Sequence, residues 1–119
     1  IIEEVTEAIN KDQRISFLGW KSFDVLTDIL CAADIYLQPG TQSVTMQHSL
    51  CCRCAVILDD VPSHRMYVDK NGWLIGRDGT LPEIISHIDN ADLETMKLAS
   101  FRYAQDYLDY SFLANRIFR

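Results

Sequence analysis

The sequence lacks features that would place the protein in a membrane, secretory or nucleic-acid-binding class. No apolar run approaches the ~20 residues that a membrane-spanning helix needs, and the first residues do not have the pattern of a signal peptide. The 11 lysines and arginines are scattered along the chain, and the formal net charge is -6, which argues against binding to nucleic acid. We therefore expect a soluble, cytoplasmic domain with no transmembrane segment.

The cysteines lack the spacing of a metal site. They are Cys31, Cys51, Cys52 and Cys54; the last three form a CCxC run, and no second CxxC and no HxxxH pair follows it. Structural zinc sites use such paired spacings, whereas free cysteines of cytosolic proteins are mostly small, buried, reduced residues. The sequence predicts four reduced thiols, no bound zinc and no other cofactor. A redox role is the alternative interpretation.

The segment from residue 34 to residue 60 organises the rest of the chain. Residues 34–38 and 55–58 are apolar runs without polar alternation, which is typical of parallel strands that are covered on both faces. Pro39 and Gly40 end the first run, and residues 41–54 leave room for about three helical turns. This pattern predicts one parallel β-α-β crossover.

Further helix and strand patterns precede and follow this crossover. Residues 1–11 have an amphipathic helical pattern and are expected to lie on the sheet. Residues 15–19 are expected to form a short strand that ends at Gly19, and Ser22 is expected to cap the next helix. A last strand is expected at residues 73–75, so the sheet is predicted to have four parallel strands.

The last third of the sequence predicts two more helices. Thr80 and Glu83 have the spacing of a capping box, with Pro82 in the first helical turn, and Asp92 is expected to cap the final helix. Buried-type strands that alternate with amphipathic helices predict an α/β fold. We expect one domain over residues 1–119, with a parallel sheet as the middle layer of a three-layer sandwich.

Several pieces of the sequence, taken in order, resemble a known family. They are FLGW at residues 17–20, AADIYLQPG at 32–40, CAVIL at 54–58 and NGWLIG at 71–76. With helices between them, they resemble the C-terminal, nucleotide-sugar-binding half of GT-B glycosyltransferases, particularly the retaining family 4 type. The resemblance covers roughly residues 14–89.

The resemblance implies a Rossmann-like domain that binds a nucleotide-diphosphate sugar as donor substrate without a metal ion. It also implies that the chain is truncated at its N-terminus and belongs to a larger enzyme. The missing N-terminal domain of the same chain would then hold the acceptor, a saccharide or a lipid-linked saccharide. Any peripheral contact with the inner membrane would come through that absent domain.

The expected ligand site lies at the start of the helix that follows Gly40. Gly40, Thr41 and Ser43 leave backbone N–H groups at a helix N-terminus, next to the carboxyl end of a parallel strand. Such a position attracts anions, most often phosphate. Gln47 lies one turn after Ser43, so it faces the same way and could reach ribose hydroxyls.

Two further residues are candidates for this site. Arg65 lies in the loop after the strand at residues 55–58, at the same edge of the sheet, and its guanidinium suits a phosphate or a carboxylate. His64 is in the same loop and is interpreted as a solvated residue. The resemblance places Trp20 near the nucleotide base; the alternative is that Trp20 packs as a hydrophobic plug over the next helix.

The sequence departs from the family within the expected site. Family members usually carry a glutamate shortly after the proline and a second one eight residues later, which bonds the ribose. No glutamate lies between Pro39 and Cys54, and Ser43 and Gln47 are the nearest residues to those places. A glutamine amide can hydrogen-bond ribose hydroxyls, but it contributes no negative charge. No catalytic residue is assigned.

The expected function is transfer of a sugar from a nucleotide-diphosphate sugar to an acceptor, in synthesis of bacterial surface polysaccharide or glycoconjugate. Two alternatives remain open at this point. One is a nucleotide-sugar epimerase of the same fold, which would use carboxylates and histidines from both halves. The other is a non-catalytic α/β module that binds a nucleotide or a partner.

Overall fold

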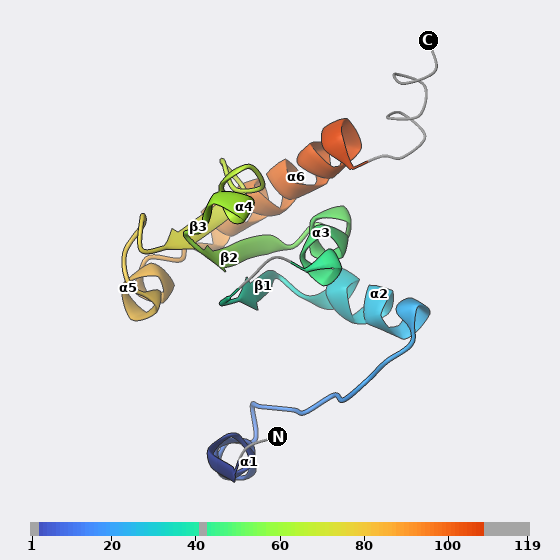
Figure 1. Cartoon of the computed structure of the whole chain (residues 1–119), viewed down its shortest axis with the longest axis vertical. Coiled ribbons are helices and arrows are strands. Elements are labelled where there is room, and N and C mark those ends of the chain that lie inside the picture. Colours follow the sequence, from blue (N-terminus) through green and yellow to red (C-terminus); the bar gives the residue numbers. More distant parts are fainter. Residues whose placement is uncertain (1–2, 41–42, 109–119) are drawn as a thin grey trace.

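The computed structural model describes residues 3–40 and 43–108 and shows an α/β protein (Figure 1). Its strands are β1 (Ile35–Gln38), β2 (Ala55–Asp59) and β3 (Gly72–Ile75). Its helices are α1 (Glu3–Lys11), α2 (Phe23–Ala32), α3 (Val44–Cys51), α4 (Pro62–Arg65), α5 (Leu81–Ser86) and α6 (Asn90–Tyr107). In the described part of the chain, no helix combines the length and apolar character that crossing a membrane requires.

The strands form a parallel sheet in the order β1-β2-β3. Ile35 pairs with Ala55 and Val56 pairs with Gly72, so the strands predicted near residues 34–38, 55–58 and 73–75 are confirmed, as is their parallel direction. Gly72 lies so close to β2 that a Cβ atom there would be 2.0 Å from the Val56 carbonyl oxygen. Any larger residue at position 72 would therefore push the two strands apart.

The main core lies between β2, β3 and the helices α3 and α6. Met46 and Leu50 of α3 pack against Val56, Leu58 and Leu74 of the sheet, and all of these side chains are 0 % exposed. Tyr67, Val68 and Ala104 complete this cluster. Burying each large apolar side chain contributes roughly 1.5–3 kcal/mol, so this cluster is the main source of stability.

A second, smaller cluster joins α2 to the start of β2. Leu30 packs against Cys52 and Cys54, with Leu26 and Ala33 beside it. The predicted cap of α2 is confirmed, because the Ser22 hydroxyl accepts a hydrogen bond from the Val25 amide.

The caps of the last two helices were predicted with mixed success. Thr80 caps α5 as predicted, and its hydroxyl accepts from the Glu83 amide and also contacts the Glu83 carboxylate. The predicted cap at Asp92 is wrong, because the Asp89 carboxylate accepts from the Ala91 amide at 2.7 Å. Asp89 has the extended backbone that a cap requires, whereas Asp92 already lies in the first turn of α6.

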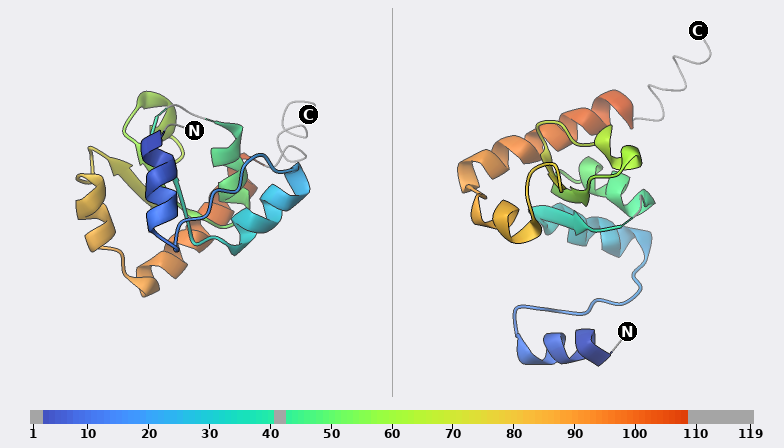
Figure 2. Two further views of the ribbon diagram at one scale, coloured as in Figure 1. Left: turned by 90° about the horizontal axis from the view of Figure 1, so that it is seen from below. Right: turned by 60° about the vertical axis from the view of Figure 1, so that its left-hand side comes forward.

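The strand predicted at residues 15–19 is wrong. This segment has no strand structure, and the side chains of Ile15, Phe17 and Leu18 are 45 %, 63 % and 50 % exposed. Figure 1 and the right-hand view of Figure 2 show it running away from the sheet. An apolar run becomes a strand only when a neighbouring backbone supplies hydrogen bonds, and no strand among residues 3–40 and 43–108 pairs with this one.

Two expectations about covering of the sheet are also wrong. Helix α1 forms, but none of its residues is buried, so it does not lie on the sheet. Strand β1 is not covered on both faces, because none of its residues is buried and Leu37 is 45 % exposed. The reason is position: β1 lies at an edge of the sheet, whereas β2 lies between two strands.

Candidate functional site

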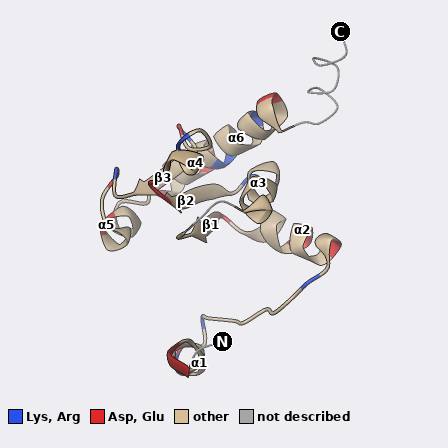
Figure 3. Ribbon diagram, viewed as in Figure 1, with Lys and Arg blue, Asp and Glu red and all other residues tan. Residues whose placement is uncertain are grey.

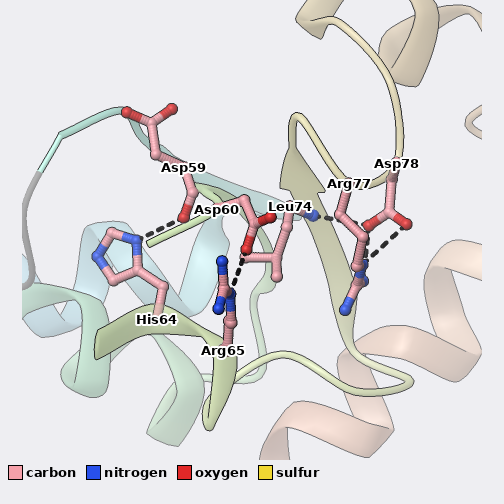
Figure 4. Close-up of polar contacts among 7 residues, drawn as sticks. All are labelled: Asp59, Asp60, His64, Arg65, Leu74, Arg77 and Asp78. Carbon is pink, nitrogen blue, oxygen red and sulfur yellow. Dashed lines mark hydrogen bonds and ion pairs between the residues drawn. The ribbon is translucent and has the colours of Figure 1, made fainter. Parts of the chain in front are cut away.

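The carboxyl ends of the three strands meet at one edge of the sheet, because the strands are parallel. The loops that follow them carry Gly40 after β1, Asp59 and Asp60 at the end of β2, and Asp78 after β3. Open parallel sheets bind ligands at this edge. Figure 4 shows the polar contacts that the β2 and β3 loops make there.

Gly40 is held by a carboxylate. Its backbone N–H donates to Asp59 Oδ2 at 2.7 Å, and its φ of 98° lies in the left-handed region that favours glycine. The amide that the sequence suggested for phosphate therefore already has an anionic acceptor. A phosphate at this amide would have to displace the Asp59 carboxylate. Thr41, whose backbone N–H was expected beside that of Gly40, lies outside the described residues.

Ser43 is the N-cap of α3. Its hydroxyl accepts a hydrogen bond from the Met46 amide at 3.2 Å and donates one to Gln38 Oε1 at 2.8 Å. The Ser43 hydroxyl therefore contacts both the last residue of β1 and the first turn of α3. This contact places the end of β1 and the first turn of α3 next to each other.

Gln47 lies one turn further along α3 and is half-buried. Its side-chain amide donates to the Tyr67 hydroxyl at 3.3 Å, which ties α3 to the segment that follows α4. Gln47 also lines a cavity of about 180 Å³ between α2 and α3, together with Phe23, Val44 and His48. It is thus positioned by the fold and is not simply solvated.

Arg65 ends the short helix α4, and its side chain is 59 % exposed. Its Nε donates to Asp60 Oδ1 at 2.7 Å, so the guanidinium is held at the edge of the sheet (Figure 4). Trp20, in contrast, is 102 % exposed and lies on the segment that leaves the sheet. The interpretation of Trp20 as a hydrophobic plug is wrong, and the structure does not bring it together with Ser43 or Arg65.

His64 is not the solvated residue that its loop position suggested. Its side chain is 0 % exposed, and Nδ1 lies 2.9 Å from the backbone oxygen of Asp59. Because a carbonyl oxygen only accepts, Nδ1 carries a proton. Nε2 is buried and has no hydrogen-bond partner among the described residues. Figure 4 shows the imidazole under the end of β2, with the Asp59 carboxylate pointing away from it.

A sequence signal for the burial of His64 exists. Pro62 begins a helical turn, and His64, Tyr67 and Val68 then have the i, i+3, i+4 spacing of a buried face. All three side chains are buried in the structure. Their spacing was available, but four residues of helix are too few for a recognisable period.

The turn after β3 is closed by Asp78. Its carboxylate accepts from the Leu74 amide at 2.8 Å and from Arg77 at 2.6 Å. The hydrogen bond from Arg77 is the main reason that the pKa of Asp78 lies below its ordinary value, and the Leu74 amide adds to this. Beside this turn, a cavity of about 350 Å³ is lined by Ile75, Gly76, Gly79, Thr80, Leu81 and Glu83.

Acidic residues at this edge were missed as site residues. Asp59, Asp60 and Asp78 contribute three carboxylates, against the two guanidinium groups of Arg65 and Arg77. Their positions directly after β2 and β3 were readable from the sequence. An edge of this composition offers hydrogen-bond acceptors for hydroxyl groups, and Arg65 is the better placed cation for an anion.

Two further observations concern a metal ion and comparisons with known proteins. Within residues 3–40 and 43–108, no group of three or more His, Cys, Asp or Glu side chains could hold a metal ion. Comparisons of the chain with protein-family models, with curated proteins and with solved structures return no match.

Proposed function

We propose that this chain is the Rossmann-like, donor-binding half of a GT-B glycosyltransferase, which transfers a sugar from a nucleotide-diphosphate sugar to an acceptor. The observation that carries the proposal is the parallel crossover of β1, α3 and β2, with Ser43 capping α3 beside the carboxyl edge of the sheet. A helix N-terminus at this edge is the usual place for the phosphates of a nucleotide.

The residues at this edge could bind two different parts of the donor, its hydroxyl groups and its diphosphate. Gln47 and the Asp59 carboxylate can accept hydrogen bonds from ribose or sugar hydroxyls, as the family's missing glutamates would. Arg65 is exposed at the end of α4, so its guanidinium can turn from Asp60 to the diphosphate. Cationic side chains and a helix N-terminus stabilise a diphosphate leaving group without a metal ion.

Transfer also needs an acceptor site, which the proposal assigns to a second domain of the same chain. The acceptor would be a saccharide or a lipid-linked saccharide. Such a site lies between the two halves of the enzyme, so the present domain alone is expected to bind donor but not to transfer sugar.

A second candidate is a partner-binding α/β module without catalytic activity. It is favoured by the hydrogen bond from the Gly40 amide to Asp59, since this contact occupies a donor that a nucleotide phosphate would use. The two candidates differ in outcome: only the glycosyltransferase would convert a nucleotide sugar when a complete enzyme is supplied with an acceptor.

The test is the affinity of the purified domain for UDP and GDP, measured by calorimetry, in the parent and in Gln47→Ala. Loss of one ribose hydrogen bond is expected to weaken binding by about 0.5–1.5 kcal/mol, or roughly 2- to 13-fold. Because Gln47 also bonds to Tyr67, the matched control is Tyr67→Phe, which removes the same internal hydrogen bond but keeps the amide. Its affinity should match that of the parent.

Two results would overturn the proposal. One is that the parent domain binds neither UDP nor GDP. The other is that Gln47→Ala and Tyr67→Phe have the same affinity, because the amide would then act only within the fold.

A further inference from the structure

Three cysteines from two helices line one surface cavity. Cys31 comes from α2, while Cys51 and Cys52 come from the end of α3, and the cavity of about 300 Å³ is completed by Arg53 and Lys97. The sequence separates Cys31 from the others by about twenty residues, so only the fold brings them together. The cavity lies apart from Gly40, Ser43 and the other residues of the candidate donor site.

The thiols of Cys31 and Cys52 are neighbours within this cavity. The Cys52 sulfur lies 3.9 Å from the Thr27 carbonyl oxygen, and Thr27 is one turn before Cys31 on the same face of α2. Helical side chains lean towards the N-terminus, so the Cys31 side chain covers the turn that Cys52 contacts. Both side chains line the same cavity.

Contacts between α2 and α3 hold these thiols in place. The Thr27 hydroxyl lies 2.9 Å from His48 Nε2, and the Phe23 ring stacks on the His48 ring with centroids 4.6 Å apart. Both contacts involve residues one or two turns before Cys31 and Cys52. The pair is therefore set by the packing of two helices and does not depend on a loop.

The cysteines differ in access to solvent. Cys31 is exposed, whereas Cys52 is 7 % exposed and Cys54 is 0 % exposed with its thiol donating to the Leu30 carbonyl at 3.2 Å. Burial is the main cause that raises the pKa of Cys52 to about 12 and that of Cys54 to about 11. Of the pair Cys31 and Cys52, the exposed Cys31 is therefore the thiol that an oxidant meets first.

We propose that Cys31 and Cys52 form a peroxide-reactive dithiol site that closes to a reversible intramolecular disulfide. The Cys31 thiolate attacks one oxygen of hydrogen peroxide, the O–O bond breaks, and hydroxide leaves as the sulfur becomes a sulfenic acid. The Cys52 thiol then attacks this sulfur, the S–O bond breaks, and water leaves as the disulfide forms. In sum, two thiols are oxidised and one peroxide is reduced to two waters.

Two cations, Arg53 and Lys97, line the cavity. Their charge can stabilise the hydroxide that leaves in the first step. Lys97 also pairs with Asp34 at 2.8 Å, and Arg53 lies over the Phe101 ring. The disulfide would tie α2 to the end of α3, whose first turns carry Ser43 and Gln47. The proposal of a dithiol site does not depend on the proposed function.

The experiment treats the reduced chain with a small excess of hydrogen peroxide and then blocks the remaining thiols by alkylation. Mass spectrometry of the intact chain should show the loss of two hydrogen atoms and two remaining alkylated cysteines. Peptide mapping should identify a Cys31–Cys52 link, and dithiothreitol should reverse it. Cys51→Ser is the matched control, because Cys51 lines the same cavity and is exposed, yet it should leave the link intact.

The Cys31→Ser variant is expected to form no intramolecular disulfide. Because Cys31 is exposed, this variant should fold like the parent, which far-ultraviolet circular dichroism would check. Three results would each overturn the proposal. They are a link from Cys31 to Cys51 or Cys54, an intramolecular disulfide that persists in Cys31→Ser, and conversion of Cys31 to sulfinic acid with no disulfide at any peroxide concentration.

Discussion

Residues 3–22 and residues 55–75 contain comparable apolar side chains but differ in burial. In the second region, Val56, Leu58 and Leu74 are 0 % exposed, whereas Phe17 and Leu18 of the first region are 63 % and 50 % exposed. Figure 3 shows that α1 carries a face of acidic residues and stands apart from the sheet. The comparison shows that apolar side chains in a regular pattern are buried only where a neighbouring helix or strand packs against them.

Local and non-local interactions account for this difference. Helix α1 has Glu3 and Glu4 in its first turn and Lys11 in its last, which suits the helix dipole, and it buries none of its residues. Asp12 and Arg14 pair across two residues in the following turn. Strand β2 instead depends on β1 and β3 for its backbone hydrogen bonds, and these strands bring the covering helices with them.

The largest expected difference in stability is between two leucine-to-alanine variants, one in each region. Leu58→Ala is expected to lower the free energy of unfolding by about 2–5 kcal/mol, because Leu58 is fully buried in the main core. Leu18→Ala should change it by less than about 0.5 kcal/mol, because Leu18 contributes little buried surface. Urea unfolding followed by circular dichroism measures both. Equal losses for the two variants would show that residues 15–19 are packed in solution.

Sequence patterns predicted a structural feature correctly where residues close in the chain determine its hydrogen bonds or its burial. The caps Ser22 and Thr80 were predicted because side-chain type and spacing decide them. The three parallel strands were predicted because the runs at residues 34–38, 55–58 and 73–75 are short, apolar and separated by turn residues. The strand at residues 15–19 had the same appearance, but its pairing depends on a second backbone that no local pattern reveals.

The candidate site was less predictable than the sheet. Ser43 caps α3 within the first turn of that helix, but the bond from the Gly40 amide to Asp59 joins residues 19 apart in the chain. The burial of His64 likewise depends on a carbonyl oxygen at the end of β2. Such contacts follow from strand order and loop shape, and neither can be read from spacing.

A smaller effect is expected from two aspartates that each pair with an arginine. Asp78 and Asp12 both have a pKa below the ordinary 3.8, chiefly because of the side-chain hydrogen bonds from Arg77 and Arg14. The Asp78 carboxylate also accepts from the Leu74 amide of β3, whereas the described contacts of the Asp12 carboxylate are with Arg14 in its own turn. Only Asp78 is therefore linked to the folding of the sheet.

The sign of the pH dependence follows from the lowered pKa. The contribution of Asp78 is fully present above the pKa of the unfolded chain, near 3.8, and is lost as the pH falls through the lower folded-state pKa. Asp78→Asn should remove up to about 1 kcal/mol at neutral pH, since the side chain is partly solvated, and should flatten the stability profile below pH 4. Asp12→Asn is the control and should leave the urea midpoint unchanged at every pH. A parallel loss in both variants would contradict the comparison.

The smallest effect on stability, and the most direct test of the comparison, concerns the two tryptophans. Trp20 lies in the exposed segment at 102 % exposure, and Trp73 lies in β3, where it is half-buried. Trp20→Phe should change the free energy of unfolding by less than about 0.5 kcal/mol. In Trp73→Phe, which retains only Trp20, the emission should already have the long wavelength of a hydrated indole, and acrylamide should quench it as strongly as in urea. In Trp20→Phe, unfolding should instead shift the emission of Trp73 to longer wavelength. Shielding of Trp20 from acrylamide in the folded chain would mean that the N-terminal segment packs on the sheet, and the contrast between the two regions would fail.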